Sequence, residues 1–295
     1  MIVPIEVTNS IYNLLKENYS LSEILNMDKY KHYIAYSIIN GLLTNYKEDK
    51  ELLKKIKEFY LNEYRMPNKI LIISDNHLGR LYDDEYLNYK KGKKKDIYIN
   101  EKGLIVAYNY AIKNKISTVL HAGDIIEGNS DRNRYRINHK EQINYLKKIY
   151  SLLREVSDIK TFLLLGNHDY NCINYNQLTE QDFNSIENIK VIGVNHTYIS
   201  MDNRLVKVVH NCSSSKSIEV PEFESEFELY GHSHYFEFNE DIRKIKLSSL
   251  TCIREWNDMS FVELQNEQQD FIFKKIDINE KQMGEYRLKK KIIMK

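Results

Sequence analysis

The chain contains few of the residues that mark several common classes of protein. Its 295 residues include three cysteines, three prolines and ten glycines. The cysteines, Cys172, Cys212 and Cys252, are widely spaced and form no C-x-x-C pair. This spacing excludes a small disulfide-stabilised scaffold and indicates a reducing, cytoplasmic setting. We interpret the cysteines as small buried or loop thiols rather than as metal ligands.

Long apolar runs and an excess of one charge are also missing. No basic segment followed by an apolar run marks a signal peptide, and no uninterrupted apolar stretch could cross a bilayer, so we expect a soluble protein with no membrane contact. The 43 Lys and Arg residues nearly balance the 42 Asp and Glu residues, which leaves a formal charge of +1. Binding to nucleic acid or to an anionic membrane would therefore need a local patch of charge.

Short apolar runs, typical of buried strands, each end in a polar motif. The runs cover residues 69–74, 117–121 and 161–165. The intervening segments, Leu104–Lys115 and Ile137–Val156, have the apolar spacing of helices. Alternation of strands and helices predicts that the motifs gather along one edge of a sheet.

The motifs are rich in carboxylate, amide and imidazole groups. In chain order they are Ser74-Asp75-Asn76-His77, Gly123-Asp124, Gly166-Asn167-His168-Asp169, an isolated His210, and Gly231-His232-Ser233-His234. Each is weak alone, since a Gly-Asp pair is usually a turn. Together they supply enough ligands of the right type to hold two divalent metal ions. For the isolated histidine we favour His210 over His196, because His210 ends the apolar run 205–209.

These motifs resemble the calcineurin-like metallophosphoesterase superfamily, whose pattern is D-x-H, G-D, G-N-H-[DE], H and G-H-x-H. The resemblance extends over roughly residues 69 to 275. It implies an α/β (α+β) fold, a two-sheet β-sandwich flanked by helices. It also implies metal ligands: Asp75, His77 and His234 for the first ion, Asp124 bridging both ions, and Asn167, His210 and His232 for the second.

The resemblance further implies a mechanism. A hydroxide bridging the two metals would attack phosphorus directly, and His168 would assist the leaving group while Asp169 orients it. Mixed oxygen and nitrogen ligands fit manganese best in our interpretation, with iron or zinc as alternatives.

Departures from the pattern bear on the substrate. Residues 123–128 read Gly-Asp-Ile-Ile-Glu-Gly and lack the arginine of the family's phosphoprotein phosphatases, whereas residues 75–79 look like the first motif of its DNA-repair nucleases. We therefore expect a phosphodiesterase or nuclease acting on nucleic acid or nucleotides. One alternative is a small-molecule phosphomonoesterase. A second is a catalytically silent metal-binding scaffold, but a silent relative would be expected to lack a ligand and this chain has all of them.

Two basic patches could guide a polymeric substrate. One covers residues 90–95 and the other contains Arg132 and Arg134. Such runs are most often solvated loops. Because they follow predicted ligand strands, Arg132 and Arg134 are candidate substrate-binding residues.

The sequence predicts three parts: a helical segment at residues 1–66, the metallophosphoesterase domain at 67–280, and a basic, mobile tail at 281–295. In the first part we expect helices at 9–18, from about Ser20, and at 33–46 and 50–64, with a capping box at Ser20–Glu23. A cap, a homodimer contact or a site for a partner protein fits this segment better than a DNA-reading helix-turn-helix, since its charges are balanced. Later strands are expected at 242–250, 259–264 and 271–278.

Overall fold

The computed structural model describes residues 3–31, 33–80, 99–128, 137–175, 177–210, 222–251 and 259–291. Its helices are α1 (Ile5–Lys16), α2 (Leu21–Leu25), α3 (Ala35–Tyr46), α4 (Lys50–Glu63), α6 (Ile99–Lys113), α7 (His139–Val156), α8 (Asn167–Asn174) and α9 (Glu180–Asn184). Its strands are β1 (Lys69–Ile73), β2 (Thr118–His121), β3 (Lys160–Leu165), β4 (Ile189–Val194), β5 (His196–Met201), β6 (Arg204–Val209), β7 (Glu228–His234), β8 (Glu237–Asn239), β9 (Lys244–Ser248), β10 (Ser260–Asn266), β11 (Asp270–Asp277) and β12 (Gln282–Lys289).

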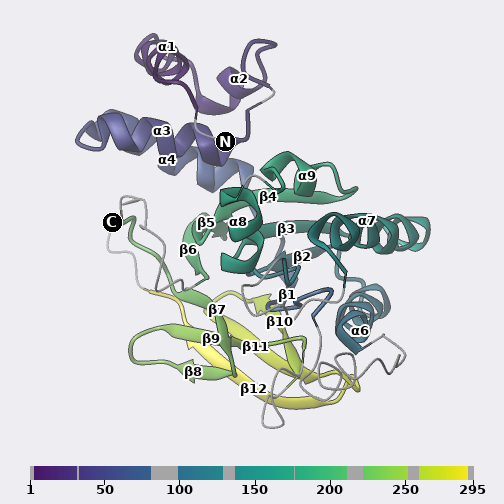
Figure 1. Ribbon diagram of the computed structural model, residues 1–295. Coiled ribbons are helices and arrows are strands. Elements are labelled where there is room, and N and C mark those ends of the chain that lie inside the picture. Colours follow the sequence, from purple (N-terminus) through teal and green to yellow (C-terminus); the bar gives the residue numbers. More distant parts are fainter. Residues whose placement is uncertain are drawn as a thin grey trace.

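Two mixed sheets form the centre of the molecule (Figure 1). The described strands hydrogen-bond in one continuous order, β12-β11-β10-β1-β2-β3-β4-β5-β6-β7-β9-β8. The first sheet is the part of this order up to β4, and the second sheet is the part from β5 onward. Strands β1 to β4 are parallel, and β10 to β12 extend their edge in antiparallel fashion. Among the described strands, the ladder that joins β4 to β5 consists of one residue pair, Val194 with His196. The fold is thus the predicted two-sheet sandwich.

One apolar core lies between the sheets. Ile70, Ile72 and Leu120 of the first sheet share a cluster of buried side chains with Val206 and Leu229 of the second. Alternation along each strand sends the other side chains, such as Leu71 and Val119, to a second core against α6 and α7. Burial on both faces explains why β1 and β2 read as continuous apolar runs in the sequence.

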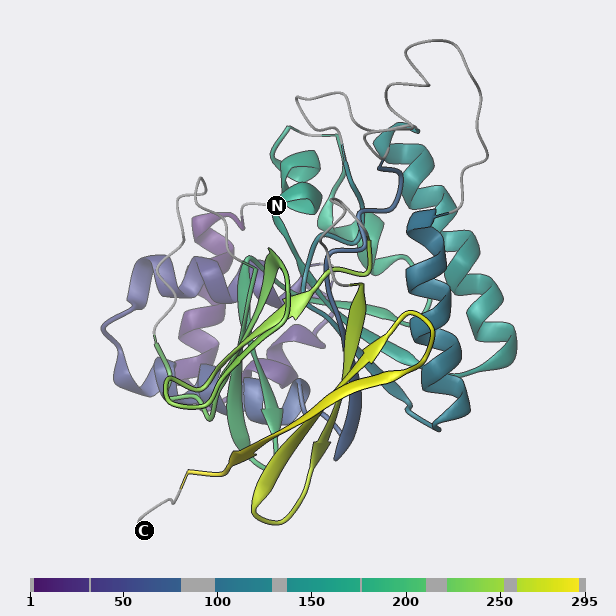
Figure 2. The ribbon, with the colours of Figure 1, turned by 90° about the horizontal axis from the view of Figure 1, so that it is seen from below.

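The N-terminal helices extend the inter-sheet core. In Figure 1 they lie together beside β4 to β6, and Figure 2 shows them on the side of the sandwich away from α6 and α7. Ile56 and Tyr60 of α4 belong to the inter-sheet core cluster, and the Tyr60 ring lies 5.6 Å from that of Tyr198 in β5. The predicted capping box of Ser20 and Glu23 is present at the start of α2. Among the described residues, no helix is both long and apolar enough to span a membrane.

The prediction of a mobile tail from residue 281 is wrong for most of its length. Residues Gln282–Lys289 form β12, which pairs with β11 along the sheet edge. Exposed Glu285, Arg287 and Lys289 alternate here with Tyr286 and the fully buried Leu288. The basic residues are therefore the solvent-facing half of an edge strand, where charge discourages pairing with another chain.

Candidate metal centre

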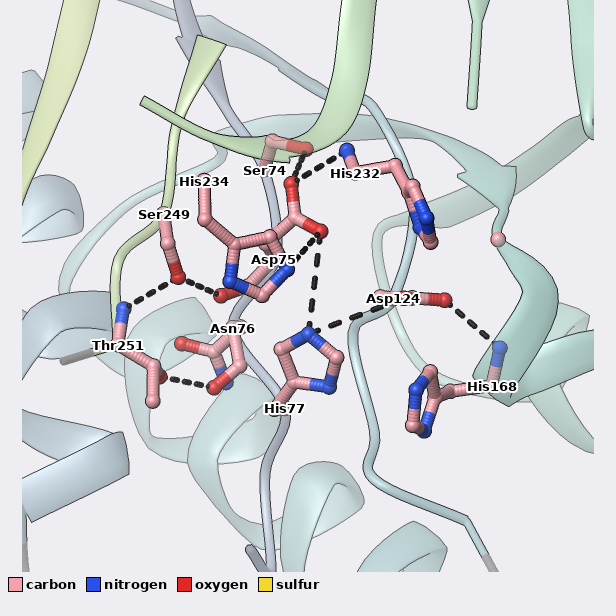
Figure 3. A network of polar contacts seen from close by, with 12 residues as sticks. Ser74, Asp75, Asn76, His77, Asp124, His168, His232, His234, Ser249 and Thr251 are labelled. Carbon is pink, nitrogen blue, oxygen red and sulfur yellow. Dashed lines mark hydrogen bonds and ion pairs between the residues drawn. The ribbon is translucent and has the colours of Figure 1, made fainter. Parts of the chain in front are cut away.

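The predicted ligand residues converge at the ends of strands from both sheets. Asp75 and His77 follow β1, Asp124 follows β2, and Asn167 begins α8 directly after β3. The second sheet contributes the remaining histidines: His210 after β6, and His232 and His234 at the end of β7. Parallel neighbouring strands bring these ends to one edge, as Figure 3 shows for most of the residues.

Close approach of backbone to ligands explains two of the motif glycines. A Cβ atom on Gly166 would lie 2.3 Å from Oδ1 of Asp124, and one on Gly123 would lie 2.3 Å from Nδ1 of His210. Gly123 also has a φ of 105°, which L side chains rarely adopt. No side chain fits at either position without displacing a ligand.

Several ligand residues have a left-handed backbone themselves. The φ values of Asp75, His77, Asp124, His232 and His234 lie between 47° and 69°. Such conformations cost about 1–3 kcal/mol each for residues other than glycine and gather at functional sites. The sharp turns they produce aim the side chains at a common centre.

The described residues form three overlapping clusters with metal-ligand spacing. Within each cluster one ligand atom per residue lies within 4.8 Å of the others. The clusters are Asp75 with His77 and His234, Asp124 with His210 and His232, and His77 with Asp124 and His168. The first two correspond to the two ligand sets that the family resemblance implies, and His77 and Asp124 connect them through the third.

Distances within the centre are those of ligands around a common point. Nε2 of His234 lies 3.2 Å from Oδ1 of Asp75, and Nε2 of His210 lies 3.0 Å from Oδ2 of Asp124. Nε2 of His77 is nearly equidistant from the two carboxylates, at 3.8 Å from Asp75 and 3.7 Å from Asp124 (Figure 3).

Buried polar atoms without hydrogen bonds support metal binding. Within the described structure, Oδ1 of Asp75, Oδ2 of Asp124, Oδ1 of Asn167 and Nε2 of His210 are buried and accept or donate no hydrogen bond. An unsatisfied buried polar atom normally costs about 1–3 kcal/mol. All four atoms belong to predicted ligands, and Nε2 of His210 lies 3.9 Å from Oδ1 of Asp75 and 3.0 Å from Oδ2 of Asp124. The donor set fits two divalent metal ions.

The histidine tautomers are set by partners behind the ligands. Nδ1 of His210 donates to the carbonyl oxygen of Ala122 at 2.8 Å, so Nε2 is the ring nitrogen that faces Asp124 and is available to a metal ion. Nδ1 of His77 lies 2.9 Å from Oε2 of Glu127, which directs its Nε2 to the metal side in the same way. Such outer partners fix ring orientation and raise ligand basicity.

The charges at the centre follow from burial and from mutual attraction. Burial lowers the pKa of His77 to about 4, so its imidazole is neutral and suited to a metal. Burial alone would raise the pKa of Asp75, but the nearby imidazoles of His234 and His210 hold that pKa below its ordinary value. Both carboxylates therefore stay ionised in a largely buried site.

His168 lies at the solvent side of the cluster, with its side chain 21% exposed. Its backbone N–H donates to Oδ1 of Asp124 at 2.8 Å, and its Nδ1 donates to the carbonyl oxygen of Glu127 at 2.8 Å. Nε2 is thereby turned away from this backbone anchor. Burial lowers the pKa of His168, but the charges of Asp124 and Glu127 outweigh it and raise the pKa above its ordinary value.

The expectation that Asp169 orients His168 is wrong. The Asp169 carboxylate is fully buried and accepts from the backbone N–H groups of Gly166, Ile125 and Ile126. It connects the loop after β2 to the start of α8, while Glu127 holds the imidazole of His168. Burial and the nearby charge of Asp124 raise the pKa of Asp169 to about 7.

Sequence reasoning missed Glu127 and the groups that support Asp75. The signal for Glu127 is its place three residues after Asp124, in the motif that lacks the arginine of the phosphoprotein phosphatases. Ser249 donates from Oγ to the carbonyl oxygen of Asp75 at 2.7 Å, and Thr251 donates from Oγ1 to that of Asn76. The sequence around these hydroxyls carries no signal of that role.

Some residues named in the sequence predictions lie outside the described residues. They are Arg132, Arg134, residues 90–95, Cys212 and Cys252.

The sequence comparison identifies the family. A family profile described as calcineurin-like phosphoesterase matches residues 68–267. The chain belongs to this family. The calcineurin-like phosphoesterase match spans β1 to β10 and so contains all the predicted ligands. A search of curated proteins finds no significant match.

Solved structures of similar fold include proteins from E. coli, Plasmodium and Danio rerio. YfcE, a phosphoesterase from E. coli, is 13% identical, with a TM-score of 0.45 over 74% of this chain and 98% of that one. GAP50 of Plasmodium is 12% identical, with a TM-score of 0.47 over 76% and 89% of the two chains. A dimetal phosphatase from Danio rerio is 9% identical, with a TM-score of 0.42 over 76% and 99%.

Proposed function

We propose that this calcineurin-like phosphoesterase hydrolyses phosphodiesters, in nucleic acid or in nucleotides, with two divalent ions. The observation that carries the proposal is the position of Glu127. Its buried carboxylate lies against His77 and His168, and Nη1 of Arg80 lies 3.4 Å from its Oε2. The positive charge of Arg80 is thus offset by Glu127 beside the site.

This charge balance favours a substrate with a single negative charge. A phosphomonoester is close to a dianion at neutral pH, and enzymes that transfer such groups commonly add arginine or lysine clamps to their metals. A phosphodiester is a monoanion and needs less positive charge. Within the described residues, the carboxylate of Glu127 offsets the charge of Arg80 beside the site, which supports the diester. The likeness of residues 75–79 to the first motif of DNA-repair nucleases supports it as well.

Two ions held by these ligands would lower the pKa of water and neutralise charge on the phosphoryl oxygens. Manganese is the proposed metal, with iron or zinc as alternatives. The protein's own contribution is orientation and a proton. Asp124 and the histidine tautomers fix the ligand geometry, and His168, anchored through Nδ1, presents Nε2 to the leaving oxygen. General acid catalysis of this kind contributes about 10²–10⁴-fold in rate.

The test compares manganese-dependent hydrolysis of an aryl phosphodiester with hydrolysis of the matching monoester. Asp124→Asn and His168→Ala report on the site, and Glu267→Gln, at an exposed residue, is the matched control. We expect diester turnover that both site variants lose and the control keeps. Preference for the monoester would replace the proposal with a small-molecule phosphatase, and no turnover by metal-loaded protein would favour a silent scaffold.

The nucleic-acid part of the proposal has its own test. Arg132→Glu and Arg134→Glu should reduce cleavage of single-stranded DNA or RNA far more than cleavage of the aryl diester, because phosphate contacts along a polymer add up. If both substitutions slowed cleavage of the polymer and of the aryl diester equally, Arg132 and Arg134 would not guide a polymeric substrate. The assignment as a phosphodiesterase would be unaffected.

A further inference from the structure

The two oxygens of the Asp75 carboxylate have different partners. Ser74 donates from Oγ to Oδ2, and the backbone N–H of His232 donates to the same oxygen at 2.9 Å (Figure 3). Within the described structure, Oδ1 has no hydrogen-bond partner. The protein thus holds one oxygen of this predicted metal ligand by two hydrogen bonds and leaves the other oxygen without one.

Oδ1 of Asp75 lies among imidazole nitrogens of the metal centre. It is 3.2 Å from Nε2 of His234, 3.8 Å from Nε2 of His77 and 3.9 Å from Nε2 of His210. All three histidines are predicted ligands. An ion held by His77 and His234 would therefore meet Oδ1 of Asp75, because Oδ2 already accepts from its two donors.

The donors to Oδ2 fix the direction of the carboxylate. Ser74 follows β1 of the first sheet and His232 belongs to β7 of the second, so Oδ2 is held from both sheets. Ser74 and Asp75 are both 0% exposed, so water does not compete for their hydrogen bond. Oγ of Ser74 also lies 3.4 Å from the carbonyl oxygen of Ala122, but a hydroxyl has one proton to donate and its contact with Oδ2 is much shorter.

We propose that Ser74 is a positioning residue that keeps Asp75 a one-oxygen ligand and thereby makes the centre discriminate against calcium. Calcium takes about six to eight oxygen ligands and binds carboxylates through one or both oxygens, whereas first-row transition metals accept fewer ligands and bind imidazole. Holding Oδ2 away from the ion removes one of the few oxygens that this histidine-rich centre could offer to calcium. The inference rests on the two-ion part of the proposed function and is independent of the substrate.

The experiment titrates calcium into the manganese-loaded full chain and follows the released manganese by electron paramagnetic resonance. In Ser74→Ala, Oδ2 loses one of its two hydrogen bonds and can turn toward the ion. Changes to such outer partners cost about 10–100-fold in metal affinity, so we expect manganese to bind more weakly while calcium gains an oxygen. The calcium concentration that releases half of the manganese should therefore fall by about tenfold or more.

Ser200→Ala is the matched control. Ser200 is a buried serine on β5 whose Oγ has no hydrogen-bond partner within the described residues, so its loss should leave the release of manganese unchanged. The proposal would be overturned if Ser74→Ala weakened both ions equally, as a merely structural serine would, or if it behaved like the control. Absence of manganese binding by the wild type would remove the metal centre and this proposal with it, whereas absence of turnover with manganese bound would contradict only the proposed function.

A crystal structure of the manganese-loaded wild type tests the proposal without any substitution, and it decides the matter if Ser74→Ala fails to fold. We expect the ion on Oδ1 of Asp75 alone, with Oγ of Ser74 and the backbone nitrogen of His232 still in contact with Oδ2. An ion bound to both oxygens of Asp75 would overturn the proposal.

Discussion

Oε2 of Glu127 lies 2.9 Å from Nδ1 of His77, a predicted metal ligand. The same oxygen lies 3.6 Å from Nδ1 of His168, whose ring also donates to the Glu127 carbonyl. One acidic residue in the loop after β2 therefore orients both a ligand and the candidate general acid. Its side chain is 1% exposed, so water cannot replace it easily.

Glu127→Gln should weaken metal binding and slow the reaction together. An amide can still accept from His77, but it carries no charge to raise the basicity of the imidazole. Changes to such outer partners typically cost about 10–100-fold in metal affinity or activity. Manganese affinity measured by calorimetry and turnover at saturating metal are the readouts. Retention of both within twofold would show that Glu127 only fills space.

His168→Gln should lower turnover by about 10²–10⁴-fold and leave the metal content unchanged. The reason is that His168 sits at the solvent side of the cluster and is not needed for the first two ligand sets. Metal content measured by mass spectrometry separates the two effects. His139→Gln on α7 is the matched control, and loss of metal from the His168 variant would make this histidine a ligand.

Gly166→Ala should disrupt the metal centre because the added methyl group collides with Asp124. The new Cβ would lie 2.3 Å from Oδ1 and 2.5 Å from the backbone nitrogen of Asp124, so the loop must move. Overpacking of this kind costs about 1–3 kcal/mol of stability, and here it also displaces a ligand. Gly284→Ala is the control, because its nearest neighbour is the hydroxyl end of Tyr286. The melting temperature and metal affinity of the two variants should differ clearly.

Chelation should lower the melting temperature, and added manganese should restore it. Without metal, the two carboxylates and the buried unpaired atoms destabilise the native state, whereas a ligand at 100 times its Kd stabilises by about 2.7 kcal/mol. Differential scanning calorimetry at increasing manganese concentrations gives the shift. Asp124→Asn should respond much less, and an equal response in that variant would place the stabilising metal elsewhere.

Asp49 should stabilise the N-terminal helices in a pH-dependent way. Its Oδ1 caps α4 by accepting from the backbone of Leu52, and Lys16 and Tyr12 contact its Oδ2. The Lys16 and Tyr12 hydrogen bonds lower the pKa of Asp49 below its ordinary value of 3.8. Stability from a depressed carboxyl pKa is present above that ordinary value and disappears as the pH falls below it.

Asp49→Ala should therefore cost about 1 kcal/mol or more near neutral pH through loss of the cap. The difference from the wild type should shrink below about pH 4. Asp49→Asn keeps the cap and loses the charge, so it should show the smaller loss. Urea denaturation across this pH range measures both, and a difference that grows on acidification would contradict the assignment.

The strands that position the ligands were predictable because each is a continuous apolar run that ends at a motif. Buried parallel strands leave little room for polar residues, so the boundary between Ile73 and Ser74 is visible in the sequence. Helix limits were less accurate: α6 begins at Ile99 rather than near Leu104, since its first turn carries polar residues that break the apolar pattern.

The remaining features depend on contacts between distant segments. Glu127, not Asp169, holds the imidazole of His168, and this depends on how two loops pack. The sequence does not distinguish the two residues, because both are acidic and both stand beside a motif. The edge strand β12 looked like a tail because its outward residues are charged. Its pairing with β11 is visible only once both strands are placed.

The junction of the two sheets gives the metal centre a mechanical consequence. The hairpin that joins β4 to β5 has one backbone pair, and its central residue, Asn195, accepts from the backbone N–H of His210 at 2.6 Å. Ions shared by ligands of both sheets would therefore cross-link the two sheets beside this short β4–β5 junction. Because linkage is reciprocal, a substitution that stiffens or loosens this hairpin would alter how tightly the protein retains its metals even when every ligand is intact.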